Sequence, residues 1–150
     1  YKVNQIVNYN WLEESVLEEA TDRLKNLKKE GYISEIGTFE HYSEINSETC
    51  NLEKIKFTLK GQMDYANKQD KIVFEFKCVE KLDDSHFLQT LLYNYINGDD
   101  YDKYYLYNIK NDELYQVSST QENLQEIVDI LINNKKHYRI SDEDFKKINC

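Results

Sequence analysis

The feature that most constrains the fold is the segment Lys71–Val79, which is apolar on both faces of the strand that it predicts. Successive side chains of a strand point to opposite faces, so Phe74 and Phe76 share one face and Val73 lies on the other. A strand that is apolar on both faces is typical of the covered centre of a sheet. The segment therefore predicts a sheet with helices packed against it.

Hydrophobic periodicity predicts the other elements and their order. Turn-forming residues separate these elements, as in the polar run 67–70 and at Gly31 and Gly98. The expected elements are a helix at Asn10–Lys29, strands at Tyr32–Ile45, Ile55–Tyr65 and Lys71–Val79, a helix at His86–Ile96, strands at Tyr101–Ile109 and Glu113–Val117, and a helix at Gln121–Asn133. The order α-β-β-β-α-β-β-α predicts an α/β fold in which helices flank a mixed central β-sheet.

Length and composition predict one domain over residues 1–150. A chain of 150 residues can bury a hydrophobic core, and its 40% of hydrophobic residues is a globular balance. No apolar run approaches the roughly 20 residues that span a bilayer, so we expect no membrane-spanning segment. The printed sequence begins at Tyr1 with no basic-then-apolar leader, so we expect no signal peptide and expect the chain to be part of a longer polypeptide.

Three scattered cysteines, Cys50, Cys78 and Cys150, indicate the compartment. Their number is odd, and their spacing matches neither a disulfide framework nor a zinc site. Because disulfides are rare in reducing compartments, this pattern is typical of an intracellular protein of the cytoplasm or nucleus.

The net charge limits how this chain could bind nucleic acid. At −9, it argues against a domain that holds nucleic acid by overall electrostatic attraction, because phosphate contacts need lysine or arginine. Nucleic-acid binding would therefore depend on a local site, on bound metal cations or on an attached partner domain.

An ionisable pair lies within the predicted central strand. Glu75 and Lys77 share one face of that strand with Val73 and Val79. Burial of such groups costs several kcal/mol each, on the order of magnitude measured for buried charges, unless they are paired or bound to metal. The pair therefore indicates either a functional site or a Glu75–Lys77 couple that only seals the strand.

The hairpin before this pair supplies a second carboxylate. A turn centred on Lys68 and Gln69 would place Asp64 opposite Val73 and diagonal to Glu75, on the same face. The same register places Gln62 opposite Glu75 and Lys60 opposite Lys77. Two carboxylates so arranged can share a divalent cation, whereas a slip of one residue would put Asp64 on the other face.

The predicted helix at His86–Ile96 has a polar stripe. Gln89 and Tyr93 lie one helical turn apart on it, opposite the apolar face. The full stripe consists of His86, Gln89, Thr90, Tyr93 and Asn97. Periodicity leaves two interpretations open: a solvated polar face, or a pair of side chains, Gln89 and Tyr93, that overhangs the site and touches substrate.

The ordered motifs Gly61-x-x-Asp64, Glu75-x-Lys77 and Gln89-x-x-x-Tyr93 resemble those of the PD-(D/E)XK nuclease superfamily. The last motif is similar to that of its RecB-like and phage-exonuclease-like branch. The resemblance covers about Trp11–Ile109 and implies a restriction-endonuclease-like core. Met63 stands where the family's name-giving proline would be. The cysteines do not match the iron–sulfur pattern of some RecB-like nucleases, so we expect no cluster.

The resemblance implies a metal-dependent nuclease that hydrolyses phosphodiester bonds. Asp64, Glu75 and the backbone carbonyl of Phe76 would hold Mg²⁺ or Mn²⁺, with no nucleotide cofactor. Lys77 would orient the attacking water and stabilise the transition state, and Gln89 and Tyr93 would position the strand being cut. The implied substrate is nucleic acid, with DNA preferred and RNA left open. We expect it to be cut in an exonuclease-like manner by a domain tethered to helicase or replication domains.

The family also implies an acidic residue or a histidine from the first helix or nearby. Glu13 falls at the centre of an apolar stripe on the first predicted helix, so it is a candidate metal or water ligand, or else a helix-start residue stabilised by the dipole. The stripe consists of Leu12, Val16, Ala20, Leu24 and Leu27. His41, on the first predicted strand, is the competing candidate.

Two other functions stay open. One is a viral-type RNA endonuclease that shares the metal-binding core, against which the Gln89-x-x-x-Tyr93 motif argues. The other is a non-catalytic nuclease-like module for docking or nucleic-acid binding on a larger replication or helicase protein, which the acidic net charge favours. Calorimetric titration with Mn²⁺ separates this module from a nuclease, because a non-catalytic module should bind no metal at Asp64 and Glu75.

Overall fold

The computed structural model describes residues 13–46 and 57–137. Its elements follow the order α-β-β-β-α-β-β-α, which confirms the predicted order. They are α1 (Glu14–Lys29), β1 (Thr38–Asn46), β2 (Thr58–Asn67), β3 (Ile72–Lys77), α2 (Asp84–Asn97), the short 3₁₀ helix η1 (Gly98–Asp100), β4 (Lys103–Asn108), β5 (Glu113–Val117) and α3 (Gln121–His137). Residues 10–12 of the first predicted helix and residues 55–56 of the second predicted strand lie outside the described residues.

The five strands form one mixed sheet in the order β1-β2-β3-β4-β5. The pairs β1–β2, β2–β3 and β4–β5 are antiparallel, and β3–β4 is parallel. A parallel pair needs a long crossover connection, which α2 provides here. Strand β3 is the central strand and its first four residues are buried, as the apolar pattern predicted.

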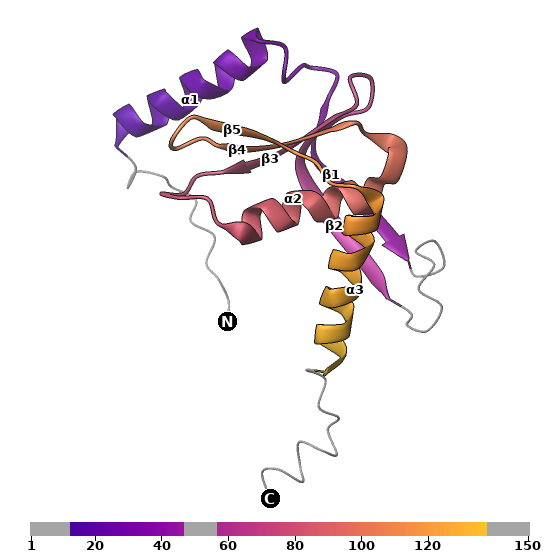
Figure 1. Cartoon of the computed structure of the whole chain (residues 1–150). Coiled ribbons are helices and arrows are strands. Elements are labelled where there is room, and N and C mark those ends of the chain that lie inside the picture. The colour runs from indigo at the N-terminus through magenta and orange to yellow at the C-terminus, as the bar shows by residue number, and fades with distance from the viewer. Residues whose placement is uncertain (1–12, 47–56, 138–150) are drawn as a thin grey trace, which may run out of the picture.

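Helices cover the two faces of the sheet (Figure 1). On one face, Leu27 of α1 packs into a core cluster with Phe74 and Tyr105. On the other face, Tyr93 of α2 packs with Val73 and Tyr104. Helix α3 lies beside α2, and Leu124 and Val128 of α3 share a core cluster with Tyr95 of α2 and with apolar residues of β1 and β2. The face of β3 that carries Val73 therefore lies against α2.

The strand predicted at Tyr32–Ile45 begins later, at Thr38. Residues 32–37 form turns and bends after Gly31, whose φ of +83° ends the helix. Ile33 within these turns is 8% exposed, so the apolar residues that suggested a strand pack into the core without pairing. Strand β3 ends at Lys77, two residues before the predicted end at Val79. At Val79 the side chain of Asn108 accepts from the backbone amide and donates to the backbone carbonyl, in place of strand-to-strand hydrogen bonds.

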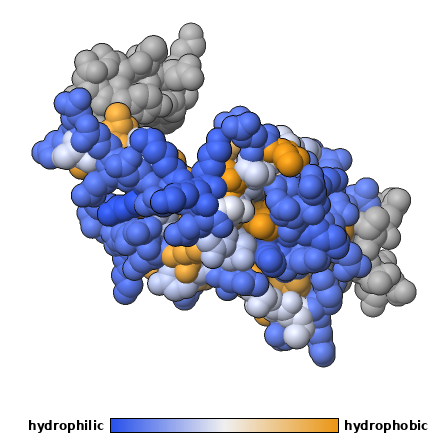
Figure 2. Space-filling view, turned by 90° about the horizontal axis from the view of Figure 1, so that it is seen from above, coloured by the Kyte–Doolittle hydropathy of each residue, from blue (hydrophilic) through white to orange (hydrophobic). Residues whose placement is uncertain are grey.

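Most of the apolar stripe predicted for α1 does not face the core. Leu27 is 4% exposed, whereas Val16 and Leu24 are 47% and 36% exposed. The helix reaches the core cluster through Leu27, near its C-terminal end. The face of the molecule seen in Figure 2 is mainly hydrophilic, with small separate hydrophobic spots. Among the described residues, no helix has the length and apolar character needed to cross a membrane.

Gly37 lies against the ring of Tyr65, which is fully buried and whose hydroxyl accepts a hydrogen bond from the Ser34 amide at 2.9 Å. A Cβ atom at position 37 would collide with this ring. We therefore expect Gly37→Ala to lower the free energy of unfolding by about 2 kcal/mol, since overpacking of a fixed core costs roughly 1–3 kcal/mol. Urea denaturation measures this difference. The control Glu35→Ala, at an exposed position of the same turn, should change it by less than about 0.5 kcal/mol, and equal stability of the two variants would contradict the prediction.

Candidate active site

The turn between β2 and β3 sets which residues of the two strands face each other. Asn67 organises this turn, because its Oδ1 accepts hydrogen bonds from the amides of Gln69 and Asp70 at 2.9 and 3.1 Å. Its Nδ2 donates to Asp70 Oδ2 at 2.7 Å. The left-handed Lys71, with φ of +54°, completes the turn before β3 begins. The turn therefore spans residues 68–71 rather than being centred on Lys68 and Gln69.

This turn shifts the register by two residues from the predicted one. Ala66 pairs with Val73, and Tyr65 with Phe74, so the predicted pairing of Asp64 with Val73 is wrong. The predicted pairs Gln62–Glu75 and Lys60–Lys77 are wrong for the same reason. A shift of two keeps the residues of β2 nearest the turn on their predicted faces, and continuation of the observed register places Asp64 opposite Glu75.

The β2–β3 ladder ends at Tyr65 and Phe74, and a side chain takes over at the next position. Asp64 Oδ2 accepts a hydrogen bond from the Phe76 amide at 2.7 Å. On the other side of β2, the pairing with β1 passes over Glu40, whose φ is +53°. Because the amide and the carbonyl of one strand residue point to the same side, the Phe76 carbonyl is directed toward the same gap between β2 and β3.

Glu75 is the buried carboxylate of the site, with 3% of the residue exposed. Its Oε1 accepts a hydrogen bond from Lys77 Nζ at 2.6 Å. Its Oε2 is buried and has no hydrogen-bond partner among the described residues. Burial raises the pKa of Glu75, and the nearby Asp64 carboxylate raises it further, while Lys77 opposes both effects. The two carboxylates are therefore neighbours, and within residues 13–46 and 57–137 the Glu75 Oε2 has no partner within hydrogen-bond distance.

Lys77 connects Glu75 to helix α2. Besides its contact with Glu75, Lys77 Nζ donates to Gln89 Oε1 at 2.9 Å, and the side chain is 19% exposed. The Glu75–Lys77 couple considered in the sequence analysis therefore exists. It is one part of a larger polar cluster that includes residues of β2 and α2.

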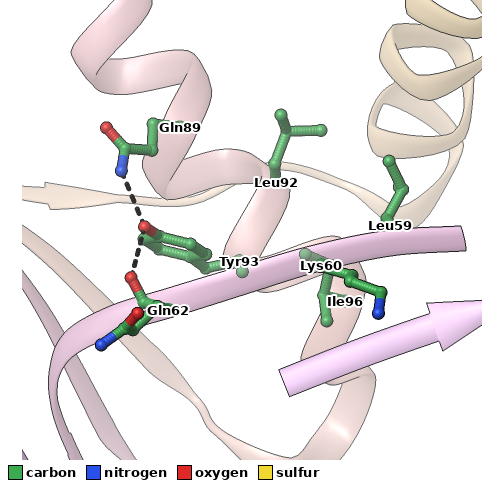
Figure 3. A pocket seen from close by; sticks show the side chains of 8 residues that line it. Leu59, Lys60, Gln62, Gln89, Leu92, Tyr93 and Ile96 are labelled. Carbon is green, nitrogen blue, oxygen red and sulfur yellow. Dashed lines mark hydrogen bonds between the residues drawn. The ribbon is translucent and has the colours of Figure 1, made fainter. Parts of the chain in front are cut away.

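Gln89 and Tyr93 lie beside β2 in the groove drawn in Figure 3. Gln89 Nε2 donates to the Tyr93 hydroxyl at 2.7 Å, and that hydroxyl donates to the backbone carbonyl of Gln62 at 2.8 Å. Tyr93 is 5% exposed and Thr90 is fully buried. The interpretation of this stripe as a solvated face is therefore wrong, because these residues face the sheet.

Burial raises the pKa of Tyr93 to about 12, and the nearby carboxylates of Glu75 and Asp64 raise it in the same direction. The hydroxyl therefore remains protonated at neutral pH. It can act only as a neutral hydrogen-bonding group there, because deprotonation beside two carboxylates is strongly disfavoured.

The groove has a volume of about 360 Å³ and lies between β2 and α2. It is lined by Leu59, Lys60, Gly61, Gln62, Gln89, Leu92, Tyr93 and Ile96. Gly61 is what allows the ring of Tyr93 to approach the strand, since a Cβ atom there would lie 2.8 Å from Tyr93 Cε1. The glycine of the motif Gly61-x-x-Asp64 thus has a packing role that sequence spacing did not reveal.

Neither candidate for an additional ligand joins Asp64 and Glu75. Glu13 is exposed and occupies the N-cap position of α1, so the prediction that it faces the core is wrong. Helix α1 packs on the face of the sheet that carries Phe74, whereas Lys77 lies on the other face and bonds Gln89 of α2. His41 pairs with Met63 and contacts Tyr101 instead, and partial burial lowers its pKa.

The described residues contain no group of three or more His, Cys, Asp or Glu side chains that could hold a metal ion. The candidate site offers three oxygen donors to a cation: the Asp64 and Glu75 carboxylates and the Phe76 carbonyl. Cys78 is an exposed free thiol, and Cys50 and Cys150 lie outside the described residues. A backbone group that sequence reasoning missed is the Gln62 carbonyl, which no side-chain pattern could have indicated.

Comparisons with known proteins give one structural similarity. No protein-family model matches the chain, and no curated protein matches it. The crystal structure of SSO0001 resembles it with a TM-score of 0.52 and 16% sequence identity, over 80% of this chain and 60% of that one. The chain thus spans less than two thirds of the length of this neighbour. At such low identity, the similarity supports the mixed α/β fold and carries no information on function.

Proposed function

We propose that this domain is a metal-dependent nuclease of the PD-(D/E)XK type, built on a restriction-endonuclease-like core. The observation that carries the proposal is the cluster at the end of the β2–β3 ladder. There the Asp64 and Glu75 carboxylates are neighbours, and the Lys77 ammonium contacts Glu75 at 2.6 Å. These are the residues of the two ordered motifs that resemble the superfamily.

The donors at this cluster fit Mg²⁺ or Mn²⁺. Both cations favour oxygen ligands, and the site offers two carboxylates and the carbonyl of Phe76. Glu75 Oε2 is buried without a hydrogen-bond partner among the described residues, and a cation would satisfy it. Asp64 is already oriented by its 2.7 Å bond to the Phe76 amide. Asp64, Glu75 and the Phe76 carbonyl would therefore hold the metal.

The chain's own groups complete the chemistry. A bound divalent cation supplies a more acidic water and neutralises the charge that grows on the phosphate. Lys77 Nζ, held between Glu75 and Gln89, orients the attacking water and stabilises the developing negative charge. Because the net charge of the protein is −9, it repels the negatively charged phosphodiester, and binding of the substrate needs local cationic groups such as the metal and Lys77.

The test is a digestion assay on end-labelled linear and on circular substrates, each as DNA and as RNA, with Mg²⁺ or Mn²⁺. We expect metal-dependent release of label from linear DNA, loss of activity on chelation, and little cleavage of circles, as for an exonuclease. Cleavage of RNA in preference to DNA would contradict the proposed substrate. Absence of cleavage of every substrate with both metals would refute the proposed function.

One observation favours a second function, a non-catalytic module that docks on helicase or replication domains or binds nucleic acid. Among the residues that the structure describes, no third acidic or histidine side chain joins Asp64 and Glu75, and Lys77 already compensates the Glu75 charge. Such a module would show neither hydrolysis nor saturable Mn²⁺ binding. Glu75 Oε2 argues against this module, because it is buried and has no hydrogen-bond partner in the described part of the chain, and a purely structural pair would leave a costly unsatisfied oxygen.

A further inference from the structure

Four hydrogen-bonded groups connect strand β2 to strand β3 through helix α2. We infer that Gln89 and Tyr93 serve the reaction as positioning residues that hold the Lys77 ammonium, and that they are not ligands of the substrate. This inference rests on the proposed nuclease function. It assigns to the motif Gln89-x-x-x-Tyr93 a role that differs from the strand positioning which the sequence suggested.

Donor and acceptor chemistry determines the direction of the hydrogen bonds from Lys77 to Gln89 and from Gln89 to Tyr93. Lys77 Nζ can only donate, so the group of Gln89 that faces it at 2.9 Å is the amide oxygen. The amide nitrogen of Gln89 is thereby turned to the Tyr93 hydroxyl, to which it donates at 2.7 Å. The Tyr93 proton is then directed to the Gln62 carbonyl, 2.8 Å away. These bonds connect the Lys77 ammonium to the backbone of β2. The Tyr93 hydroxyl also interacts with the Glu75 carboxylate.

These bonds occupy most of the polar atoms of the two side chains, and one of the two Gln89 amide hydrogens stays outside them. The Gln89 oxygen and the Tyr93 proton are both engaged, and Tyr93 is 5% exposed. A substrate contact through these atoms would break a bond in a site where an unsatisfied polar group costs roughly 1–3 kcal/mol. The elevated pKa of Tyr93, about 12, agrees with a hydroxyl that keeps its proton on the Gln62 carbonyl.

Side-chain hydrogen bonds connect β2 and β3 beyond the point where their backbone pairing ends. The β2–β3 ladder ends at Tyr65 and Phe74. Beyond it, Asp64 Oδ2 bonds the Phe76 amide, and the Gln62–Tyr93–Gln89 chain bonds Lys77. A lysine has a flexible four-carbon stem, so its ammonium needs more than the single contact with Glu75 to remain in one position. The inferred role of Gln89 is to supply this second contact.

A second tyrosine–glutamine pair in the protein provides a matched control for this inference. Tyr95 lies on the same helix, is 7% exposed, and its hydroxyl bonds Gln125 Oε1 of α3 at 3.0 Å. Tyr95→Phe and Gln125→Ala thus remove the same groups as Tyr93→Phe and Gln89→Ala, from a Gln–Tyr pair that does not contact Lys77. Thermal unfolding followed by circular dichroism would verify that all four variants fold.

The experiment separates rate from binding. Cleavage of linear DNA by saturating enzyme with Mg²⁺ gives the single-turnover rate, and fluorescence anisotropy of the same DNA with Ca²⁺ in place of Mg²⁺ gives the Kd. We expect Gln89→Ala and Tyr93→Phe to lower the rate by about 10- to 100-fold, the effect of small misplacements of a reacting group. The Kd should change by less than about twofold, which is below 0.5 kcal/mol. Both control variants should retain the wild-type rate and Kd.

A conservative variant adds a further criterion. Gln89→Glu keeps an oxygen acceptor for Lys77, so we expect it to recover most of the rate lost in Gln89→Ala. If Gln89 contacted the DNA instead, a new carboxylate near phosphates would weaken binding further. A loss confined to Kd in Gln89→Ala, with a wild-type rate at saturation, would overturn the inference and leave the nuclease function standing. A wild type without cleavage with either Mg²⁺ or Mn²⁺ would instead refute the proposed function and the inference with it.

Discussion

Lys77→Ala is expected to abolish metal-dependent DNA hydrolysis, with a fall in the rate of about 10³-fold or more, the range of a directly acting acid–base or charge-stabilising group. The reason is that Lys77 Nζ is held beside the Glu75 carboxylate at 2.6 Å and beside Gln89 at 2.9 Å. Single-turnover digestion of end-labelled linear DNA with Mg²⁺ measures the effect.

The same substitution should also destabilise the fold. It leaves the Glu75 carboxylate buried without its cation, and breaking a buried pair costs roughly 3–5 kcal/mol. Glu75→Gln/Lys77→Ala should therefore regain stability in urea denaturation without regaining activity. Lys81→Ala, at an exposed lysine four positions away, is the control and should retain full activity. If Lys77→Ala kept more than a tenth of the wild-type rate, Lys77 would not be the group that acts on the water or the phosphate.

Glu75→Gln is expected to abolish hydrolysis, by about 10³-fold or more. We also expect it to stabilise the fold by about 1 kcal/mol, because the Lys77 ammonium that remains is partly exposed, unlike the buried Glu75 carboxylate. The amide removes a metal ligand but keeps the oxygen that accepts from Lys77. Burial raises the pKa of Glu75, so the folded protein favours the neutral form of this side chain. A neutral amide removes the free energy needed to keep a charge there.

The pH dependence of this gain has a defined sign. The pKa of Glu75 is raised in the folded state, so protonated Glu75 favours the folded protein. This stabilisation of the wild type is fully present below the unfolded pKa and is lost as pH rises through the folded pKa. The stability gain of Glu75→Gln should thus be largest at neutral pH and shrink as the solution is acidified. Urea denaturation at several pH values tests this. Glu80→Gln, at an exposed glutamate, should show neither effect, and a Glu75→Gln variant less stable than wild type at neutral pH would refute the argument.

Much of the fold could be predicted because the central strand is buried on both faces. The apolar pattern of Ile72–Lys77 fixes its place in the sheet, and the order of the other elements follows from their periodicity. Hydrophobic pattern reports burial and not backbone conformation, so the packed turns at residues 32–37 were predicted as strand. The register was wrong by two residues because Asn67 closes a longer turn through its side chain than loop length alone suggests.

In the candidate site, too, some residues could be predicted from the sequence and others could not. Asp64, Glu75, Lys77, Gln89 and Tyr93 come together as their spacing suggested, because the register error was an even number of residues and each kept its face. Glu13 could not be placed from periodicity, since the apolar face of α1 is covered only near Leu27. The Gln62 carbonyl is a main-chain group, which no residue type identifies. The membership of the PD-(D/E)XK superfamily stays a prediction that the chemistry must test.

Titration calorimetry with Mn²⁺ tests the central claim most directly, because it requires no knowledge of the substrate. Wild type, Asp64→Asn and Glu75→Gln are compared at equal concentration and neutral pH, with Glu80→Gln as the exposed control. We predict saturable Mn²⁺ binding by the wild type and the control, and loss of that binding in both site variants. Equal titration curves for all four proteins, or a wild type that binds no Mn²⁺, would contradict a metal site formed by Asp64 and Glu75.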